Sequence, residues 1–207
     1  IVGSYQRLDE LEEILKEFSY RVQKKDCLDL PKKIFMSRTV ELTKEQEEAY
    51  ATMKSAALAS LKGKMATAPH VLTQLMRLHQ ITCGHLKSDD GVITNFKHSR
   101  IEELIDVIDE MEGKVIIWAN YVHDIKEITK ALEKEYDEGC VAQYYGEVST
   151  DDRQKAIKDF QDPKSKVRYF VGNTQTGGYG ITLTAASNVI YYSNSYDLEK
   201  RLQSEDR

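Results

Sequence analysis

The 207-residue chain has no long apolar stretch, and this absence narrows its class. No run approaches the roughly 18 uninterrupted apolar residues of a membrane-spanning helix, so we expect no membrane partner. The first ten residues, IVGSYQRLDE, lack the basic-then-apolar order of a secretory signal. Cysteine is scarce as well: Cys27, Cys83 and Cys140 form no CxxC pair, which argues against a disulfide scaffold and favours free thiols in a reducing cytosol. We therefore expect a cytoplasmic protein.

An excess of one charge is also missing. The chain carries 29 Lys and Arg against 34 Asp and Glu, a formal net charge of −5. With 41% hydrophobic and 30% charged residues its composition is globular, which excludes a disordered tail, a collagen-like fibre and a wholly basic nucleic-acid coat. The balance is uneven along the chain, because an acidic stretch over residues 1–19 is followed by a basic stretch over residues 20–38.

A metal site is only weakly indicated by the sequence. His79 and Cys83 would share one face of a helix, and His85 follows them closely. A structural zinc site needs four ligands, and no fourth candidate lies nearby. We therefore expect no resident metal in this chain.

Residues 1–113 have the pattern of a mainly helical or linker segment with a short β-hairpin. Thr43 and Gln46 have the spacing of a capping box at the start of a long helix. Two short strands, Tyr20–Lys24 and Ile34–Leu42, are expected around a turn at Leu30-Pro31. Helical spacing of apolar residues also predicts helices over residues 1–19, around 71–78 and over 98–111, with a polar loop over 87–95.

Residues 114–207 have a different pattern, in which strands and helices alternate. Residues 115–119, VIIWA, form the continuous apolar run that is typical of a strand buried on both faces. Further strands are expected near residues 141–145, 168–172 and 188–192, each separated from the next by helical or turn-rich sequence. This alternation predicts a three-layer α/β/α domain with a parallel sheet, and it leaves the strand order open.

The strongest local motif is a glycine-rich loop between the third and fourth of these strands. Gly177, Gly178 and Gly180 lie there, at the carboxyl edge of the expected sheet, where open α/β sheets bind ligands. The loop fails as GxGxxG, because Leu183 stands at the third glycine position, and the chain holds no GxxxxGK[ST] motif. Close approach of a phosphate to the backbone is one explanation for the glycines, and a simple connecting turn is the other.

Two further constellations have both a functional and a purely structural interpretation. Gln203 and Arg207 lie four residues apart and so share a helical face, where a guanidinium can reach a phosphate or simply meet solvent. Ser149 and Asp152 resemble a capping box, which by itself only starts a helix.

Taken together, these segments resemble the second RecA-like lobe of Swi/Snf-type ATPases in helicase superfamily 2, which are double-stranded DNA translocases. The resemblance covers about residues 20–207, and it departs from the family at Thr176 and Thr182, where Ala and Asn are usual. The family's last motif stops after its first arginine, before the usual continuation xHRxGQ. The residues that match the family's motifs are Gly146, Ser149, Arg153 and Phe160, then Thr174, Gly177, Gly178, Gly180, Ile181, Leu183 and Ala186, and finally Gln203, Asp206 and Arg207.

This resemblance implies a role for each matching site. Arg207 would be an arginine finger, with Gln203 beside it in the catalytic motif. The resemblance implies nucleotide-binding roles for Gly178, Gly180 and Thr182, and DNA-binding roles for Thr174 and Gly177. Further DNA-binding candidates are Arg153, in a matching segment, and Lys24 and Lys25, in the basic stretch. It also implies ATP and Mg²⁺, held mainly by a first RecA-like lobe, with double-stranded DNA and that lobe as partners.

The chain has no initiator Met, and its last helical stretch has no stop signal, so we expect a piece of a longer protein. Lacking a GxxxxGK[ST] motif, the isolated piece should not hydrolyse ATP. We expect a bacterial or phage source, with the protein in the bacterial cytosol or nucleoid or in a phage-infected cell. Remodelling, repair, restriction and phage replication all stay open. The alternatives are a non-catalytic helicase-derived interaction module, a Rossmann-like small-molecule enzyme and an RNA-unwinding relative.

Overall fold

The computed structural model describes residues 6–20, 22, 33–62, 68–177 and 180–205. The chain divides into two compact units, Ile1–Ser37 and Arg38–Arg207. In the first unit, α1 (Leu8–Lys16) is the helix that the apolar spacing predicts, although its apolar side chains are exposed. The expected division between residues 113 and 114 stays a prediction. Of the described helices, none is both long and apolar enough to cross a membrane.

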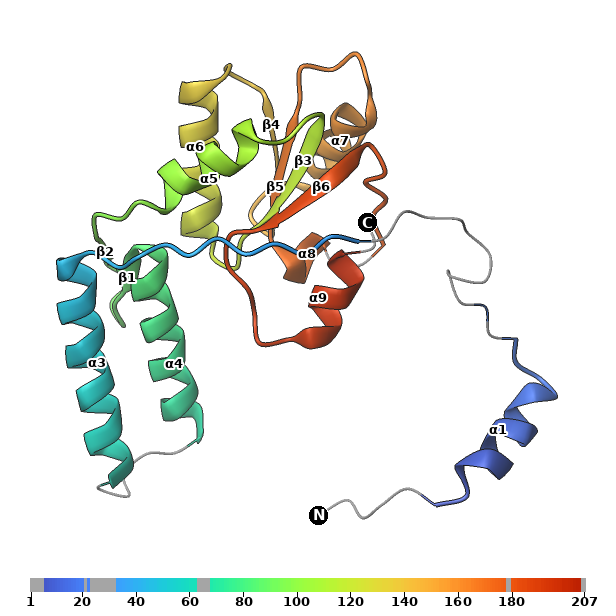
Figure 1. Cartoon of the computed structure of the whole chain (residues 1–207), viewed down its shortest axis with the longest axis horizontal. Coiled ribbons are helices and arrows are strands. Elements are labelled where there is room, and N and C mark those ends of the chain that lie inside the picture. Colours follow the sequence, from blue (N-terminus) through green and yellow to red (C-terminus); the bar gives the residue numbers. More distant parts are fainter. Residues whose placement is uncertain (1–5, 21, 23–32, 63–67, 178–179, 206–207) are drawn as a thin grey trace. The chain divides into compact units, whose positions relative to one another are not determined.

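A parallel sheet organises the second unit (Figure 1). Its strands are β3 (Lys114–Trp118), β4 (Val141–Tyr144), β5 (Tyr169–Gly172) and β6 (Ala186–Tyr191). Within the described residues they are ordered β4-β5-β3-β6, and every neighbouring pair is parallel. The α/β fold expected from the alternation is therefore confirmed, and the structure supplies the strand order that the sequence left open.

Helices cover both faces of this sheet, because side chains along each strand alternate between the two faces. Val115 and Ile117 of β3 join one core with α5 (Arg100–Asp109) and α6 (Val122–Glu135). Ile116 and Trp118 join the other core with Phe160 of α7 (Thr150–Gln161). All four β3 side chains are fully buried, which explains the uninterrupted apolar run in the sequence.

A helical pair precedes the sheet in the chain, with α3 (Lys44–Lys62) and α4 (Ala68–Cys83) lying side by side (Figure 1). The capping box at the start of α3 is confirmed. The backbone N–H of Thr43 donates to Gln46 Oε1 at 3.1 Å, and the N–H of Gln46 lies 3.4 Å from Thr43 Oγ1. The Gln46 amide also donates to the Ile81 carbonyl at 2.8 Å, which fastens α3 to α4.

The predicted hairpin is wrong in position. Residues 34–42 contain no strand, and Ile34 and Met36 are largely exposed, so these residues gain neither ladder hydrogen bonds nor burial. Most of the other expected strand, Tyr20–Lys24, lies outside the described residues. A hairpin forms instead where a polar loop was expected, from β1 (His85–Lys87) and β2 (Ile93–Asn95). Gly91 at its turn has φ +87°, a conformation that suits glycine.

Candidate functional site

The described residues of the predicted site follow the carboxyl ends of the strands, at one edge of the sheet. The last residue of β3, Trp118, is paired with Gly172 of β5 on one side and with Tyr191 of β6 on the other. On the far side of β5, Gly172 is paired with Tyr144 of β4. The segments that follow these strands therefore emerge together. They include the short helix α8 (Thr174–Gly177) after β5 and α9 (Leu198–Ser204) beyond β6, which lie side by side (Figure 1).

Asn173 anchors the start of α8. Its side-chain amide donates to the Asn120 carbonyl at 2.7 Å, and its Oδ1 accepts the N–H of Gln175 at 2.7 Å. Its own N–H donates to the Tyr144 carbonyl at 3.1 Å, while its carbonyl accepts the N–H of Gly177 at 2.8 Å. The beginning of the glycine-rich loop is thus tied to the segments that end two other strands.

Glycine at two of these positions is required by packing inside the protein. A Cβ on Gly177 would lie 2.8 Å from the Trp118 ring, and one on Gly172 would lie 2.8 Å from the Tyr144 carbonyl oxygen. Both distances are far shorter than the ordinary 3.5–4.0 Å or so of a carbon contact. Gly180 differs: its φ is +70° and a Cβ there would meet open space. The backbone conformation of Gly180 by itself favours glycine, and the space beside it leaves room for a ligand. Gly178 lies outside the described residues.

Thr174 and Thr182 occupy contrasting environments. Thr174 is 8% exposed and lines a small cavity of about 10 Å³ with residues of the β6–α9 connection and α9, room for about one water molecule. Thr182 is exposed, and its carbonyl accepts Gln161 Nε2 at 3.0 Å. The backbone after Gly180 is therefore held by the end of α7, and the Thr182 side chain faces solvent.

Arg153 lies in the first turn of α7. The cap of that helix is as predicted, since the N–H of Asp152 donates to Ser149 Oγ at 3.1 Å. The Arg153 guanidinium lies 5.8 Å from the centre of the Tyr144 ring, within cation–π range. Its Nε is buried and has no hydrogen-bond partner among the described residues. The Arg153 Nη2 also donates to Thr150 Oγ1 at 3.4 Å. Contact between Arg153 and an anion would therefore have to come from the outer part of the guanidinium, because Nε is buried.

Gln203 and its helix are held by a network that the sequence did not reveal. Gln203 Nε2 donates to Glu199 Oε1 at 2.9 Å. Arg201 lies 3.3 Å from the centre of the Tyr191 ring, and it donates to Glu205 and to Asn194, each at 2.7 Å. The i,i+4 spacing of Arg201 and Glu205 was the available signal. Arg207, Lys24 and Lys25 lie outside the described residues, so their predicted roles stay predictions.

The histidines considered for a metal contact other partners. His79 Nδ1 lies 3.0 Å from the Tyr121 hydroxyl, and His85 Nδ1 lies 3.1 Å from Asp124 Oδ1. Burial raises the pKa of the Cys83 thiol to about 12, which opposes metal binding by that sulfur. Throughout the described parts of the chain, no group of three His, Cys, Asp or Glu side chains could hold a metal ion.

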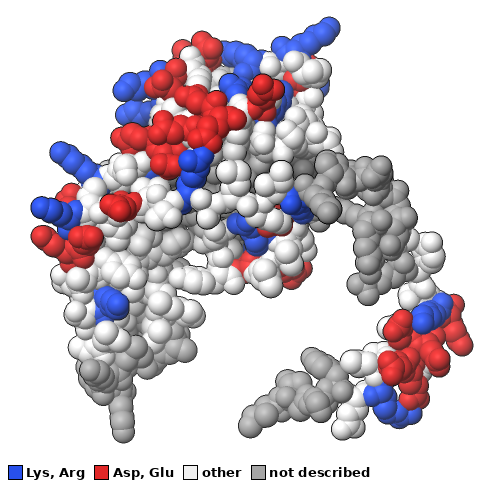
Figure 2. Space-filling model, viewed as in Figure 1, with Lys and Arg blue, Asp and Glu red and all other residues white. Residues whose placement is uncertain are grey.

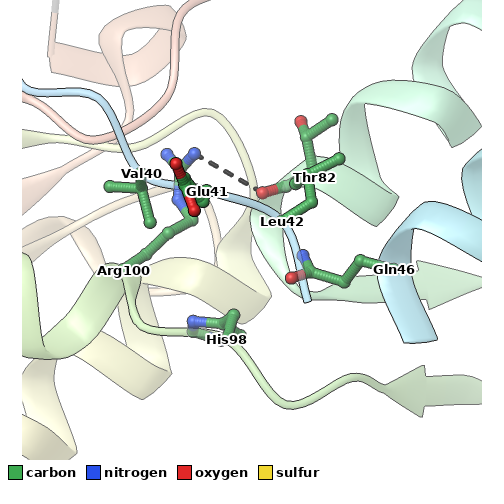
Figure 3. A pocket seen from close by; sticks show the side chains of 7 residues that line it. All are labelled: Val40, Glu41, Leu42, Gln46, Thr82, His98 and Arg100. Carbon is green, nitrogen blue, oxygen red and sulfur yellow. Dashed lines mark hydrogen bonds between the residues drawn. The ribbon is translucent and has the colours of Figure 1, made fainter. Parts of the chain in front are cut away.

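A larger cavity, of about 250 Å³, lies between the segment before α3 and the start of α5 (Figure 3). Arg100 projects into it and donates to the Thr82 carbonyl at 3.5 Å, and to the Tyr192 carbonyl. His98 contacts Glu127 Oε1 at 3.2 Å. Gln46, Thr82, His98 and Arg100 already have protein partners, so the cavity offers few polar groups to a ligand. Its lining residues are Val40, Glu41, Leu42, Gln46, Thr82, His98 and Arg100.

The charge distribution disfavours nucleic acid on one part of the surface. Acidic side chains gather where α5 covers the sheet in the view of Figure 2. Glu102 and Glu103 belong to the first turn of that helix, and Asp106 and Asp109 follow within it. A phosphate backbone would be repelled there, which directs attention to the edge with α8 and α9.

Comparison with known proteins gives a consistent result. A family model described as the helicase conserved C-terminal domain matches residues 97–207. A putative ATP-dependent helicase/translocase of Bacillus subtilis, YwqA, is 26% identical over 97% of this chain and 23% of its own length. The human SWI/SNF-related matrix-associated actin-dependent regulator of chromatin subfamily A member 1 is 27% identical over 100% of this chain and 21% of its own. The chain thus spans under a quarter of the length of either relative.

Solved structures agree with these relatives. The Sulfolobus solfataricus SWI2/SNF2 ATPase core domain matches with a TM-score of 0.68 and 28% identity, over 95% of this chain and 42% of the other. The C-terminal domain of a Sulfolobus solfataricus SWI2/SNF2 ATPase matches with a TM-score of 0.59 and 25% identity, over 73% of this chain and 68% of the other.

Proposed function

The chain belongs to the helicase conserved C-terminal domain family, as the C-terminal lobe of a Swi/Snf-type helicase, and from this membership we propose that it is the second lobe of an ATP-dependent double-stranded DNA translocase. One observation carries the proposal. The glycine-rich loop and α9 lie together at the carboxyl edge of a parallel sheet, where α/β proteins bind nucleotides.

The nucleotide side of this edge would consist of Gly178, Gly180 and Thr182. Support comes from Gly180, whose left-handed backbone faces open space and gives a phosphate access to backbone N–H groups. ATP supplies the free energy of phosphoryl transfer when bound. In the described residues no carboxylate cluster suits a metal, so Mg²⁺ and most contacts to ATP would come from the first lobe.

The catalytic contribution of this lobe would come from α9 and the residues after it. Arg207 would donate to the transferred phosphoryl group as an arginine finger, an interaction that raises rates by about 10³–10⁵. Gln203, which is half-buried on α9, would contact the same site. The Arg201 network supports this role, because it fixes α9 against Tyr191 at the end of β6.

The DNA side of this lobe would consist of α8 and the start of α7. Lys24 and Lys25, in the basic stretch of the other unit, stay separate candidates for DNA contact. Thr174 is buried, so its contribution would be through its backbone and the exposed Gln175 that follows. Gly177 has no side chain, so α8 can pack closely against the Trp118 ring at the end of β3. Arg153 would provide a charged contact to a phosphate. Such contacts position a protein on DNA without reading its sequence.

Binding of a short fluorescein-labelled duplex to the 207-residue chain tests this proposal. We expect weak binding, with Kd of about 10⁻⁴–10⁻⁶ M near physiological salt, that weakens steeply as salt is added. Arg153→Gln should lower affinity and reduce the slope of log K against log salt by about 1. Fluorescence anisotropy across a salt series measures both quantities.

Lys158→Gln is the matched control, since it removes the same charge from the exposed last turns of α7, at the other end of the helix. It should change binding little. Equal effects of the two substitutions would mean that α7 acts only through net charge. Tight binding that persists at high salt would contradict the phosphate-contact model altogether.

A further inference from the structure

A series of hydrogen bonds leads from the glycine-rich loop into the interior of the protein. It begins at Asn173, whose side chain holds the N–H of Gln175 and donates to the Asn120 carbonyl, both at 2.7 Å. Asn120 also makes a second hydrogen bond, in which its backbone N–H donates to Ser193 Oγ at 2.8 Å. The segments that follow β5, β3 and β6 are therefore linked in that order.

The direction of the next hydrogen bond follows from the chemistry of the hydroxyl group. Because Ser193 Oγ accepts the N–H of Asn120, its single proton is available to another acceptor. Two acceptors lie beside it, Asp124 Oδ2 at 3.2 Å and the Cys83 sulfur, and the carboxylate is the stronger of the two. Ser193 is buried, so a turn of its hydroxyl towards water is not an alternative. Asp124 thus determines the orientation of the hydroxyl that holds Asn120.

Asp124 lies at the inner end of this series. Its side chain is completely buried, and its other oxygen, Oδ1, lies 3.1 Å from Nδ1 of His85, which is 2% exposed. A buried carboxylate needs such partners, because an isolated one is strongly destabilising. His85 begins β1, and neither its Nδ1 nor Asp124 Oδ1 makes a hydrogen bond among the described residues, so the series of hydrogen bonds ends at Asp124.

We propose that Asp124 and Ser193 are positioning residues for the glycine-rich loop: the carboxylate orients the Ser193 hydroxyl, the hydroxyl holds Asn120, and the Asn120 carbonyl holds Asn173 at the start of α8. The functional part of this proposal rests on the proposed contact between α8 and DNA phosphate. The competing explanation is that Asp124 only balances His85 in the core. The two explanations predict different results at Asn173. If Asp124 only pairs with His85, substitution of Asp124 or Ser193 should not change the hydrogen bonds of Asn173.

The test is ¹⁵N NMR spectroscopy of the 207-residue chain carrying Ser193→Ala or Asp124→Asn. Both substitutions should shift the side-chain amide signal of Asn173 and the backbone signal of Gln175, and should speed exchange of these protons several-fold. Asn173→Asp removes the side-chain amide and so identifies its signal. Ser193→Thr retains a hydroxyl and should restore the exchange rates. If Asp124→Asn does not fold, Ser193→Ala carries the test alone.

Thr129→Val is the matched control. Thr129 is buried in the same helix as Asp124, and its hydroxyl donates to the Ile125 carbonyl at 2.8 Å, outside the series. If Ser193→Ala changes Asn173 no more than Thr129→Val does, the positioning role is overturned.

Duplex binding separates this proposal from the function on which it rests. Ser193→Ala should weaken duplex binding about fivefold, the effect of losing one ordinary hydrogen bond. If the unaltered chain binds no duplex but Asn173 responds to Ser193→Ala, the DNA-binding proposal fails and the positioning role stands. If duplex binds and the substitution changes neither Asn173 nor affinity, only the positioning role fails.

Discussion

At the residue scale, Gly177 shows a position where packing leaves no room for a side chain. The Trp118 ring would lie only 2.8 Å from a Cβ at this position, and Trp118 is itself fully buried at the end of β3. Glycines in such a loop are often interpreted as a phosphate-binding site. Here the group nearest to the Cβ position of Gly177 is the indole ring of Trp118. Gly180, with open space beside it, is the better place to look for a ligand.

Gly177→Ala should therefore destabilise the protein by about 1–3 kcal/mol, the usual effect of overfilling a packed site. Urea denaturation followed by circular dichroism measures the free energy of unfolding. Gly146→Ala serves as control, because a Cβ at Gly146 would meet nothing within 4 Å. An unfolding free energy for Gly177→Ala equal to that of Gly146→Ala would contradict the packing explanation.

At the element scale, α7 illustrates a boundary that sequence chemistry defines well. Ser149 has extended backbone and accepts the N–H of Asp152 at 3.1 Å, while its hydroxyl donates to the Asp152 carboxylate at 2.7 Å. These bonds satisfy backbone and side-chain groups that would otherwise lack partners in the first turn.

Ser149→Ala should lower the free energy of unfolding by about 1 kcal/mol, as is typical for loss of an N-cap. Ser149→Asp keeps an acceptor at the cap and should recover most of the loss. Ser55→Ala, at an exposed position within α3, makes the same chemical change and should be neutral or slightly stabilising. Thermal denaturation of the three variants decides the matter, and equal midpoints for Ser149→Ala and Ser55→Ala would rule out the cap.

Elements of this kind could be predicted because their signals are local. The capping boxes at Thr43 and Ser149 and the apolar run of β3 each lie within a few residues. The strand expected over residues 34–42 failed because β-propensity does not supply a partner strand. The pair of His85 and Asp124 lay beyond prediction for a related reason: only the fold brings β1 against the first turn of α6.

At the scale of the whole molecule, partly buried histidines make stability depend on pH. Burial lowers the pKa of His79 and of His123 below the ordinary value of 6.5. The folded state therefore resists protonation, while the unfolded chain accepts protons as the pH falls through about 6.5. The sign follows from linkage: the unfolded state binds more protons, so the free energy of unfolding rises with pH in this range.

We expect the melting temperature to fall as the pH is lowered from about 7 to about 5, the range in which an unperturbed histidine titrates. The double variant His79→Gln, His123→Gln should flatten this dependence, since glutamine does not titrate. Glu135→Gln alters an exposed carboxylate and should leave the slope unchanged. Melting curves at fixed ionic strength give the comparison, and a slope that survives in the double variant would locate the effect elsewhere.

The strand order has a consequence for how the chain is made. β3 lies between β5 and β6, and both of these partners follow it in the sequence. During synthesis the apolar β3 segment therefore leaves the ribosome well before either neighbour exists. It must wait, exposed, while the sequence up to Tyr191 is translated, in a state prone to aggregation and suited to chaperone binding. Slow, non-local closure of the sheet is thus built into the order of its strands.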